Sequence, residues 1–328
     1  MIEFRHVTKR FADGTVAVDD LSLVAPSHRI TVLVGPSGCG KTTSLRMVNR
    51  MLDPTEGQVL VDDEDIRHVD AVRLRRGIGY VIQHAGLFPH KTVADNIATV
   101  PRLLGWSRQR ARQRARELVE QVGLEPEYAD RYPAQLSGGQ QQRVGVARAL
   151  AADPPIMLMD EPFSAVDPVV RAQLQDEFLR LQRDLAKTIV FVTHDIDEAI
   201  KLGDHIAVLR VGGRLAQVDT PAGLLAEPVD DFVAGFIGRD RGYRSLSFVP
   251  ADDLQVRPLP NGTDGARLDT SYPYQRGRPL KAALDATLTA PDGRAVVVDE
   301  QGSPIGVIEH ADVIAAVRRA GARRGEGP

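Results

Sequence analysis

A glycine-rich turn between a strand and a helix constrains this chain more than any other feature. Residues Arg29–Val34 predict a buried strand, Thr42–Leu52 predict a helix, and the turn between them, Gly35–Thr42, reads GPSGCGKT. The pattern G-x-x-x-x-G-K-[ST] lets backbone N–H groups turn inward around phosphate oxygens, where larger side chains would obstruct them. The helix N-terminus adds its partial positive charge at the same place. The turn therefore predicts an α/β fold that holds a nucleoside triphosphate.

Each position of the turn has an expected part in this chemistry. Lys41 reaches the β- and γ-phosphates, and the Thr42 hydroxyl is a ligand for Mg²⁺. Cys39 occupies a free position and is interpreted as a small filler, not a nucleophile. The predicted nucleotide-binding residues here are Gly35, Pro36, Ser37, Gly38, Cys39, Gly40, Lys41, Thr42 and Thr43. The turn alone also fits kinases, GTPases and motor ATPases, but no guanine-reading N-K-x-D pattern is present, which disfavours GTP.

Two further buried strands end in polar residues. Pro155–Met159 is followed by Asp160 and Glu161, and Thr188–Thr193 is followed by His194. The carboxyl ends of the strands of an open α/β sheet border its ligand crevice, so these side chains are candidates for chemistry there. The alternatives are a helix-capping turn for the acidic pair and a structural role for the histidine.

A second glycine motif precedes a second helix. Leu136–Gln140 reads LSGGQ, and a helix is predicted over Gln141–Ala151. Ser137 can cap this helix, and the two glycines leave its first amides open to an anion. The motif predicts a second phosphate cradle on the same chain; the alternative is a helix cap with no ligand.

Taken together, these motifs resemble the ABC-transporter ATPases over about residues 1–240. The matching positions are Phe11 (adenine-stacking aromatic), Gln83 (Q-loop), Ile156–Glu161 (Walker B), Ser164–Asp167 (D-loop, with Val166 where Leu is usual) and His194 (switch histidine). The resemblance implies a P-loop NTPase fold with a helical subdomain at about residues 88–152. Phe11 has an alternative interpretation, as an aromatic packed in the core.

The resemblance also implies roles for these residues, with ATP and Mg²⁺ as cofactors. Glu161, His194 and Gln83 are the expected catalytic residues: a general base, a group that orients base and water, and a sensor of metal and water. Thr42, Gln83 and Asp160 are the expected metal-binding residues. In this family two copies sandwich ATP head to tail, which implies a homodimer. The residues expected to reach the partner's nucleotide are Ser137, Gly138, Gly139, Gln140 and Asp167.

Longer stretches are similar to the importer ATPases for glycine betaine, proline, carnitine and choline. They include Ile78–Gln83, Gly86–His90, Thr92–Ile97, Thr193–Ala199 and Asp240–Arg244. This similarity implies integral membrane permease subunits and an extracytoplasmic solute-binding protein or domain as partners, with this chain at the cytoplasmic face of the membrane. The alternatives are import of another small solute, an ABC ATPase that serves no transporter, and a sensor that binds ATP without hydrolysing it.

The pattern of alternating strands and helices stops near residue 241. Residues 241–279 are predicted to be a linker, and 321–328 a frayed tail. Between them, 280–320 shows the order helix, strand, strand, helix and looks like one cystathionine-β-synthase-type (CBS) module, an α+β unit. We hypothesise that the single modules of two subunits pair across the dimer; the alternative is a purely structural tail.

Composition excludes other classes of protein. The formal net charge of -3 provides no basic field, so no nucleic-acid partner is expected. No apolar run reaches the roughly 18 residues that a membrane helix needs, so other polypeptides are expected to supply any span. A single cysteine and the absence of a leader-like N-terminus predict an unprocessed cytosolic chain. Arginines at 108, 110, 112, 114 and 116 predict a solvated helix face, with contact to an anionic membrane as the alternative.

Overall fold

The computed structural model describes residues 1–83, 85–164, 166–259 and 271–325. The chain divides into two compact units, and each is treated by itself. Unit 1 comprises residues 1–224 and 228–236, and unit 2 comprises residues 225–227 and 237–328. All motifs of the predicted nucleotide site belong to unit 1.

A six-stranded sheet forms the centre of unit 1. Its order is β10-β9-β3-β8-β7-β6, and every neighbouring pair is parallel except β10 with β9. The strands are β3 (Ile30–Val34), β6 (Ile78–Val81), β7 (Ile156–Asp160), β8 (Thr188–Thr193), β9 (His205–Arg210) and β10 (Arg214–Asp219). Every residue of β3, β7 and β8 is buried, which explains their continuous apolar runs, as expected for strands covered on both faces. The predicted α/β fold is confirmed.

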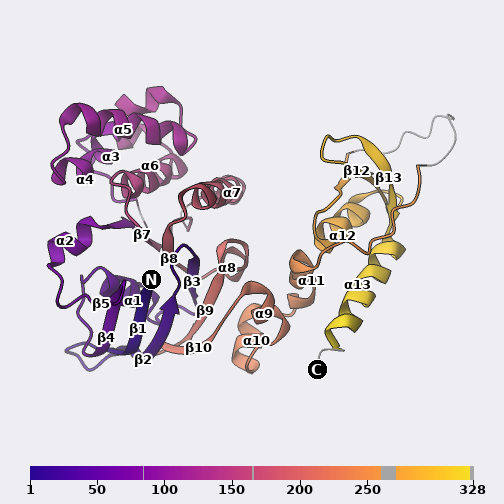
Figure 1. The fold of residues 1–328 in the computed structure, drawn as a ribbon, viewed down its shortest axis with the longest axis horizontal. Helices are drawn as coiled ribbons and strands as arrows, with labels where there is room; N and C mark the ends of the chain where they lie inside the picture. The colour runs from indigo at the N-terminus through magenta and orange to yellow at the C-terminus, as the bar shows by residue number, and fades with distance from the viewer. Residues whose placement is uncertain (84, 165, 260–270, 326–328) are drawn as a thin grey trace. The chain divides into compact units, whose positions relative to one another are not determined.

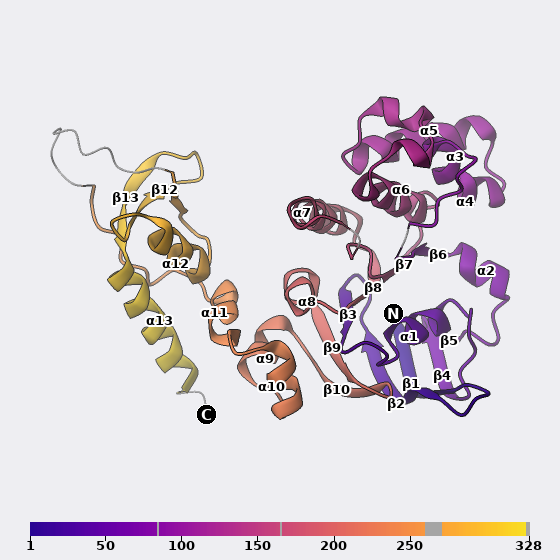
Figure 2. The ribbon, with the colours of Figure 1, turned by 180° about the vertical axis from the view of Figure 1, so that it is seen from behind.

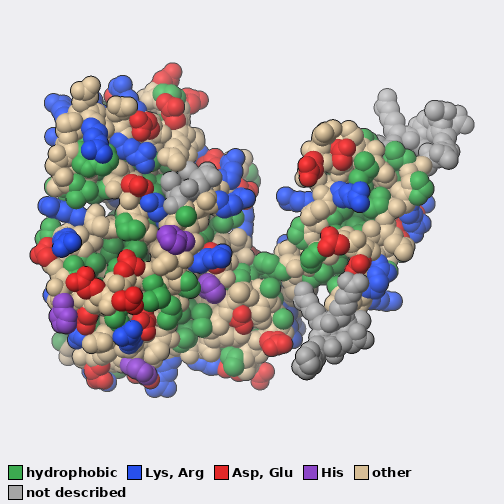
Figure 3. All heavy atoms as spheres, viewed as in Figure 1, with side chains coloured by type: hydrophobic (Ala, Val, Ile, Leu, Met, Phe, Trp, Pro, Cys, Tyr) green, Lys and Arg blue, Asp and Glu red, His purple; other side chains and the backbone are tan. Residues whose placement is uncertain are grey.

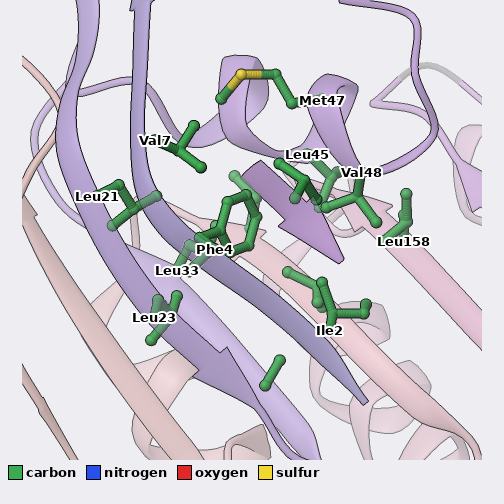
Figure 4. Packing of buried hydrophobic residues seen from close by; sticks show 14 of the residues in the cluster. Ile2, Phe4, Val7, Leu21, Leu23, Leu33, Leu45, Met47, Val48 and Leu158 are labelled. Carbon is green, nitrogen blue, oxygen red and sulfur yellow. The ribbon is translucent and has the colours of Figure 1, made fainter. Parts of the chain in front are cut away.

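A second, antiparallel sheet packs against the first through helix α1. Its order is β2-β1-β4-β5. The bounds are β1 (Ile2–Arg10), β2 (Val16–Ala25), β4 (Glu56–Val61), β5 (Glu64–Asp65) and α1 (Lys41–Val48). Figure 4 shows Phe4 and Leu21 of this sheet facing Leu33 of β3 and Leu45 of α1. This shared core fixes α1, and the turn before it, relative to β3.

Helices between β6 and β7 form a group of their own in unit 1. Figures 1 and 2 show α3–α6 lying together beyond the β6 side of the sheet. The elements of this group are α3 (Val93–Ile97), α4 (Thr99–Leu103), α5 (Arg108–Gln121), η1 (Pro126–Asp130), η2 (Pro133–Gln135) and α6 (Gly138–Leu150), whereas α2 (Ala71–Arg76) precedes β6. Thr92, Ser107 and Ser137 cap α3, α5 and α6 with their side-chain oxygens, which sets where each helix begins. This group occupies the stretch in which a helical subdomain was predicted.

The remaining helices of unit 1 follow β7, β8 and β10. They are α7 (Pro168–Leu185), α8 (Ile196–Leu202), α9 (Pro221–Ala226, its last two residues in unit 2) and α10 (Asp231–Ile237, its last residue in unit 2). Among the described residues, no helix combines the length and apolarity that crossing a bilayer requires.

One predicted helix end is wrong. The helix expected to run to Leu52 ends at Val48, because Asn49 leaves the helical conformation and Arg50 adopts a left-handed φ of 54°. The backbone N–H groups of Met51 and Leu52 both donate to the carbonyl of Arg46. A tight turn therefore closes the helix about one turn early.

The arginine-rich helix α5 forms ion pairs with its own Glu117 and with Asp130 of η1. Arg112 and Arg116 lie 4.0 and 3.7 Å from Asp130, and Arg114 lies 3.6 Å from Glu117. Figure 3 shows Lys and Arg side chains interspersed with Asp and Glu over the face of unit 1 that it presents. These pairings favour the solvated-face interpretation of the helix.

Unit 2 contains the predicted order helix, strand, strand, helix. The elements are α11 (Arg241–Ser245), η3 (Leu246–Phe248), β11 (Tyr274–Gln275), α12 (Leu280–Thr289), β12 (Arg294–Val298), β13 (Pro304–Glu309) and α13 (His310–Gly325). The three strands form one sheet in the order β11-β12-β13. The secondary structure agrees with the prediction, while the CBS assignment and the pairing of modules across a dimer stay predictions.

Residues 241–279, which were predicted to be a linker, contribute buried side chains to unit 2. Leu246, Val249 and Leu254 are buried in the same core as Leu280 of α12, and so is Tyr274. Arg257 forms an antiparallel β-bridge with Val307 of β13, the edge strand of the sheet. The described parts of 241–279 therefore belong to the folded unit, because their scattered apolar residues complete its core. Residues 260–270 lie outside the described part of the chain.

The predicted tail also differs in part. The last helix, α13, continues to Gly325, so the backbone of 321–325 is helical. Residues 326–328 lie outside the described part of the chain.

Candidate nucleotide-binding site

The turn between β3 and α1 can be built only with glycine at two of its positions. Gly35 has φ 155°, and a Cβ there would lie 2.3 Å from the carbonyl oxygen of Leu209. Gly40 has φ 86°, and its Cβ would lie 2.2 Å from the carbonyl oxygen of Ala17. Any larger residue at either position would displace backbone, so the spacing of the two glycines follows from the close approach of β9 and β2.

Lys41 points back into the turn. Its Nζ donates to the carbonyl oxygens of Gly35 and Pro36, at 2.8 and 3.0 Å, and only 6% of the residue is exposed. Cys39 is fully buried beside it, and burial raises the pKa of the thiol. A buried neutral thiol fits the interpretation of Cys39 as a filler. The ammonium group lies against the loop carbonyls, beside the place where phosphate oxygens would be bound.

Thr42 and Asp160 bring two oxygen ligands together. Thr42 Oγ1 donates to Asp160 Oδ1 at 2.9 Å, joining the first turn of α1 to the end of β7. Burial raises the pKa of the Asp160 carboxyl, and the charge of neighbouring Glu161 adds to the effect. A hydroxyl and a single carboxylate are the hard oxygen donors that Mg²⁺ uses in nucleotide sites, where phosphates complete its shell. The residues present therefore fit a magnesium ion.

Three strand ends converge on the Glu161 carboxylate. Its Oε2 lies 3.1 Å from Nδ1 of His194, which follows β8, and accepts a 3.3 Å hydrogen bond from Nε2 of Gln83, which follows β6. Glu161 itself has a left-handed φ of 47° and donates its backbone N–H to the carbonyl of Val192. A non-glycine residue in this conformation is strained, and such strain is found most often at functional sites. The structure thus brings all three predicted catalytic residues together.

A cleft connects the glycine turn to these side chains. Its volume is about 470 Å³, and it is lined by Ala17, Ser37, Gly38, Cys39, Gly40, Lys41, Thr42, Thr43, Gln83, Glu161 and His194. Ala17 was missed by sequence reasoning, because it is a small residue within a strand and carries no chemical signal. Phe11 is 38% exposed in the turn between β1 and β2 and is not among the lining residues. Its position is not that of a core aromatic, and its role in stacking stays a prediction.

The second glycine motif is placed differently. Ser137 caps α6: its Oγ accepts from the N–H of Gln140 at 3.3 Å, while Gln140 Oε1 accepts from the N–H of Ser137 at 2.9 Å. Asp167 caps α7 through the N–H of Val169 at 3.0 Å. None of Ser137, Gly138, Gly139, Gln140 and Asp167 is among the residues that line the cleft of their own chain. Ala165, within the predicted D-loop, lies outside the described residues.

Comparisons with known proteins agree with this geometry. The sequence profile described as "ABC transporter" matches residues 18–164. The osmoprotectant import ATP-binding protein OsmV of Salmonella typhimurium is 47% identical over 318 residues, which cover 95% of this chain and 80% of that protein. This chain belongs to the ABC transporter family. It binds and hydrolyses ATP as an ATPase of that family.

Two further relatives extend the comparison. The carnitine transport ATP-binding protein OpuCA of Listeria monocytogenes is 53% identical over 298 residues, covering 87% of this ABC chain and 75% of that protein. The solved dimer of the ATP-binding cassette MJ0796 in a post-hydrolysis state, bound to ADP and Pi, has a TM-score of 0.62 and 34% identity. The match covers 67% of this chain and 99% of the cassette.

Proposed function

We propose that this ABC ATPase drives the import of an osmoprotectant of the glycine betaine, carnitine, choline and proline class. The relatives named above serve osmoprotectant import and carnitine transport, and they match most of this chain. The proposed partners are a second copy of the chain, integral membrane permease subunits and an extracytoplasmic solute-binding protein or domain. The chain would work at the cytoplasmic face of the cell membrane.

The phosphates of ATP would occupy the turn at the start of α1. Lys41 would exchange its bonds to the Gly35 and Pro36 carbonyls for bonds to phosphate oxygens. The first amides of α1 have no side-chain cap, so they are free to donate to the same anion. Phe11 would stack on the adenine from the neighbouring strand turn.

Thr42, Asp160 and Gln83 would hold Mg²⁺ beside the phosphates. The ion, when bound, neutralises charge on the phosphate oxygens as it develops in phosphoryl transfer. Thr42 and Asp160 already lie 2.9 Å apart, and a cation between them would favour the ionised form of the buried carboxyl. The support for this proposal is the chemistry of the donor set.

Glu161 would act as general base for the attacking water. Its carboxylate is held by His194 on one side and Gln83 on the other. His194 would keep Glu161 oriented and contact the γ-phosphate, and Gln83 would position the water. The step is mostly one of positioning, since phosphoryl transfer gains most from placed charges and donors.

A partner chain would complete the site. Ser137–Gln140 and Asp167 form helix starts that lie outside the cleft of their own chain. In a head-to-tail pair, the α6 start of one copy would meet the γ-phosphate held by the other. The support for a pair of copies is that the similar cassette MJ0796 is dimeric in its post-hydrolysis state.

The observation that carries the catalytic part of the proposal is the convergence of Gln83 and His194 on Glu161 beside the Lys41 turn, while the transport part rests on the relatives. The test is uptake of radiolabelled glycine betaine and carnitine by cells that lack their own osmoprotectant importers and express this chain with its permease and binding protein. Wild type is expected to support uptake, and Glu161→Gln to abolish it while lowering ATP hydrolysis by about 10²–10⁴-fold. Uptake that is equal with and without this chain would contradict the assigned transport function.

A further inference from the structure

The turn at Ala85 and Gly86, called here the turn after Gln83, is held against helix α6. After β6, Ala85 adopts a left-handed φ of 49° and donates its N–H to the carbonyl of Ile82 at 3.1 Å. Gly86 is also left-handed, with φ 54°. A turn built from two successive left-handed residues is unfavourable by itself for a residue with a Cβ, so something outside it must stabilise it.

Arg148 of α6 supplies that stabilisation. Its Nη1 donates to the carbonyl oxygen of Gly86 at 2.6 Å, and its Nη2 donates to the carbonyl oxygen of Ala85 at 2.5 Å. Arg148 is half-buried, and this burial lowers the pKa of the guanidinium. A planar fork that binds two adjacent carbonyls holds them in one fixed geometry, which a lysine ammonium cannot reproduce.

Helix α6 also approaches the turn closely at a second point. A Cβ on Gly145 would lie 3.3 Å from the Cβ of Ala85 and 3.4 Å from its Cα. One turn of helix further on, a Cβ on Gly79 of β6 would lie 2.6 Å from the carbonyl oxygen of Ala149. The C-terminal half of α6 is therefore packed directly on β6 and on the turn that follows Gln83.

The same helix begins at Ser137, in the motif proposed to meet the partner's nucleotide. It spans Gly138–Leu150 without interruption, a length of about 20 Å. One rigid element thus carries Ser137 at one end and grips the backbone beside Gln83 near the other. Gln83 in turn donates to the Glu161 carboxylate.

We propose that Arg148 is a positioning residue for ATP hydrolysis: it fixes the turn after Gln83 on α6, so that Gln83 and the Ser137 helix start move as one body. This inference rests on the proposed function and adds a residue to it. Arg148 does not contact the cleft itself and acts through Gln83. Its contribution therefore depends on the presence of the Gln83 side chain.

Arg143 offers a matched control on the same helix. Its Nη1 donates to two consecutive carbonyls, those of Val122 and Gly123, at 2.9 and 3.0 Å, and it pairs with Glu177. It is a second arginine of α6 that binds two consecutive carbonyls, here just after α5, and among the described residues its hydrogen bonds do not go to the turn after Gln83. Arg143→Lys therefore reports what replacing a carbonyl-binding arginine of α6 does by itself.

The experiment measures kcat and KM for ATP with the full-length chain, in the wild-type and Gln83→Ala backgrounds. Arg148→Lys is expected to lower kcat about tenfold while KM changes by less than about twofold. In the Gln83→Ala background the same substitution is expected to change kcat by less than about twofold, because the two residues act as a unit. Arg143→Lys is expected to have the same small effect in both backgrounds.

Several outcomes would overturn the inference. If Arg148→Lys lowers kcat by the same factor in both backgrounds, the arginine does not act through Gln83. If Arg148→Lys leaves kcat at the wild-type value, the arginine does not position the site at all. If Arg148→Lys does not fold, Gly145→Ala presses on the same turn and takes its place, with the same two expectations. Wild-type hydrolysis and its loss in Glu161→Gln test the proposed function separately, so the two failures are distinguishable.

Discussion

Helices α1 and α6 of unit 1 both begin in glycine-containing motifs, yet their N-termini are capped differently. At α1 the N-cap residue is Gly40, no side chain caps the helix, and a cleft opens in front of it. At α6 the start is closed by the reciprocal bonds of Ser137 and Gln140. The first helix start is thus open toward a cleft of its own chain, where an anion could reach its amides.

The second helix start has different requirements. Its Ser137 hydroxyl and the amide of Gln140 are already paired with each other, and no residue of the motif lines the cleft of its own chain. Under the proposed function, its ligand is the nucleotide held by a second copy, and binding would exchange these bonds for bonds to phosphate. The difference between the two helix starts is what the proposed function expects if each motif serves a nucleotide shared by two copies of the chain.

The largest expected effect concerns the first helix start. Lys41→Ala removes the only charged group at the centre of the turn, so ATP hydrolysis is expected to fall by about 100-fold or more. The measurement is phosphate release together with ATP binding by calorimetry. Lys187→Ala is the control, since Lys187 pairs with Asp153 away from the cleft and should leave hydrolysis unchanged. Comparable activity in Lys41→Ala would show that the turn is not the nucleotide site.

A smaller effect is expected at the second helix start. Ser137→Ala removes a helix cap, which costs about 1 kcal/mol of stability, and also a proposed donor to the partner's nucleotide. Hydrolysis is expected to fall about tenfold, as measured above the concentration at which ATP-dependent dimers form.

Ser107→Ala is the matched control for Ser137→Ala. Ser107 caps α5 through the N–H of Arg110 at 3.3 Å, the same length as the Ser137 cap. Both variants should lose similar stability in thermal melts, and only Ser137→Ala should lose activity. Equal loss of activity in both variants would reduce the second motif to a helix cap.

A substitution at a third helix start, that of α8, should change the stability of the fold and leave ATP hydrolysis unchanged. Asp195 caps α8, and Glu198 in its first turn is 6% exposed and accepts a 3.0 Å hydrogen bond from Gln175. Burial raises the pKa of the Glu198 carboxyl; the charge of Asp195 raises it further, while hydrogen bonds from Thr193 and Gln175 and the charge of Arg171 oppose this.

The sign of the pH effect follows from that shift. The folded state binds the Glu198 proton more tightly than the unfolded chain, so this group disfavours folding progressively as the pH rises above its ordinary pKa of 4.5. Glu198→Gln should therefore melt about 2 °C higher than wild type near neutral pH, and the gap should close toward pH 4.5. A gap that widens on acidification would contradict the assigned direction.

The sequence was sufficient to predict what depends on local chemistry. Gly35 and Gly40 are required by backbone approach, and Glu161 and His194 follow fully buried strands, so their position at one edge could be predicted from pattern alone. The convergence of Gln83 on the same carboxylate followed from the family resemblance, because its short strand gives little signal.

Contacts between distant segments could not be predicted in this way. Arg148 looked like any arginine in an apolar helix, since its partners are carbonyls more than 60 residues away. The apolar residues of 241–259 are widely spaced among polar ones, with no period, so their burial against α12 was missed. The early end of α1 was also missed, since a left-handed Arg50 has no sequence signature.

The most direct test of the account mixes two inactive variants. Lys41→Ala and Ser137→Arg each disable both sites of their own homodimer. In a mixed dimer one site combines an intact Lys41 turn with an intact Ser137 start from the other copy. The account predicts that mixing the purified variants restores ATP hydrolysis to a measurable fraction of wild type. Activity that stays at the sum of the two separate variants, while mixed dimers are present by sedimentation, would contradict the claim that two copies share each nucleotide.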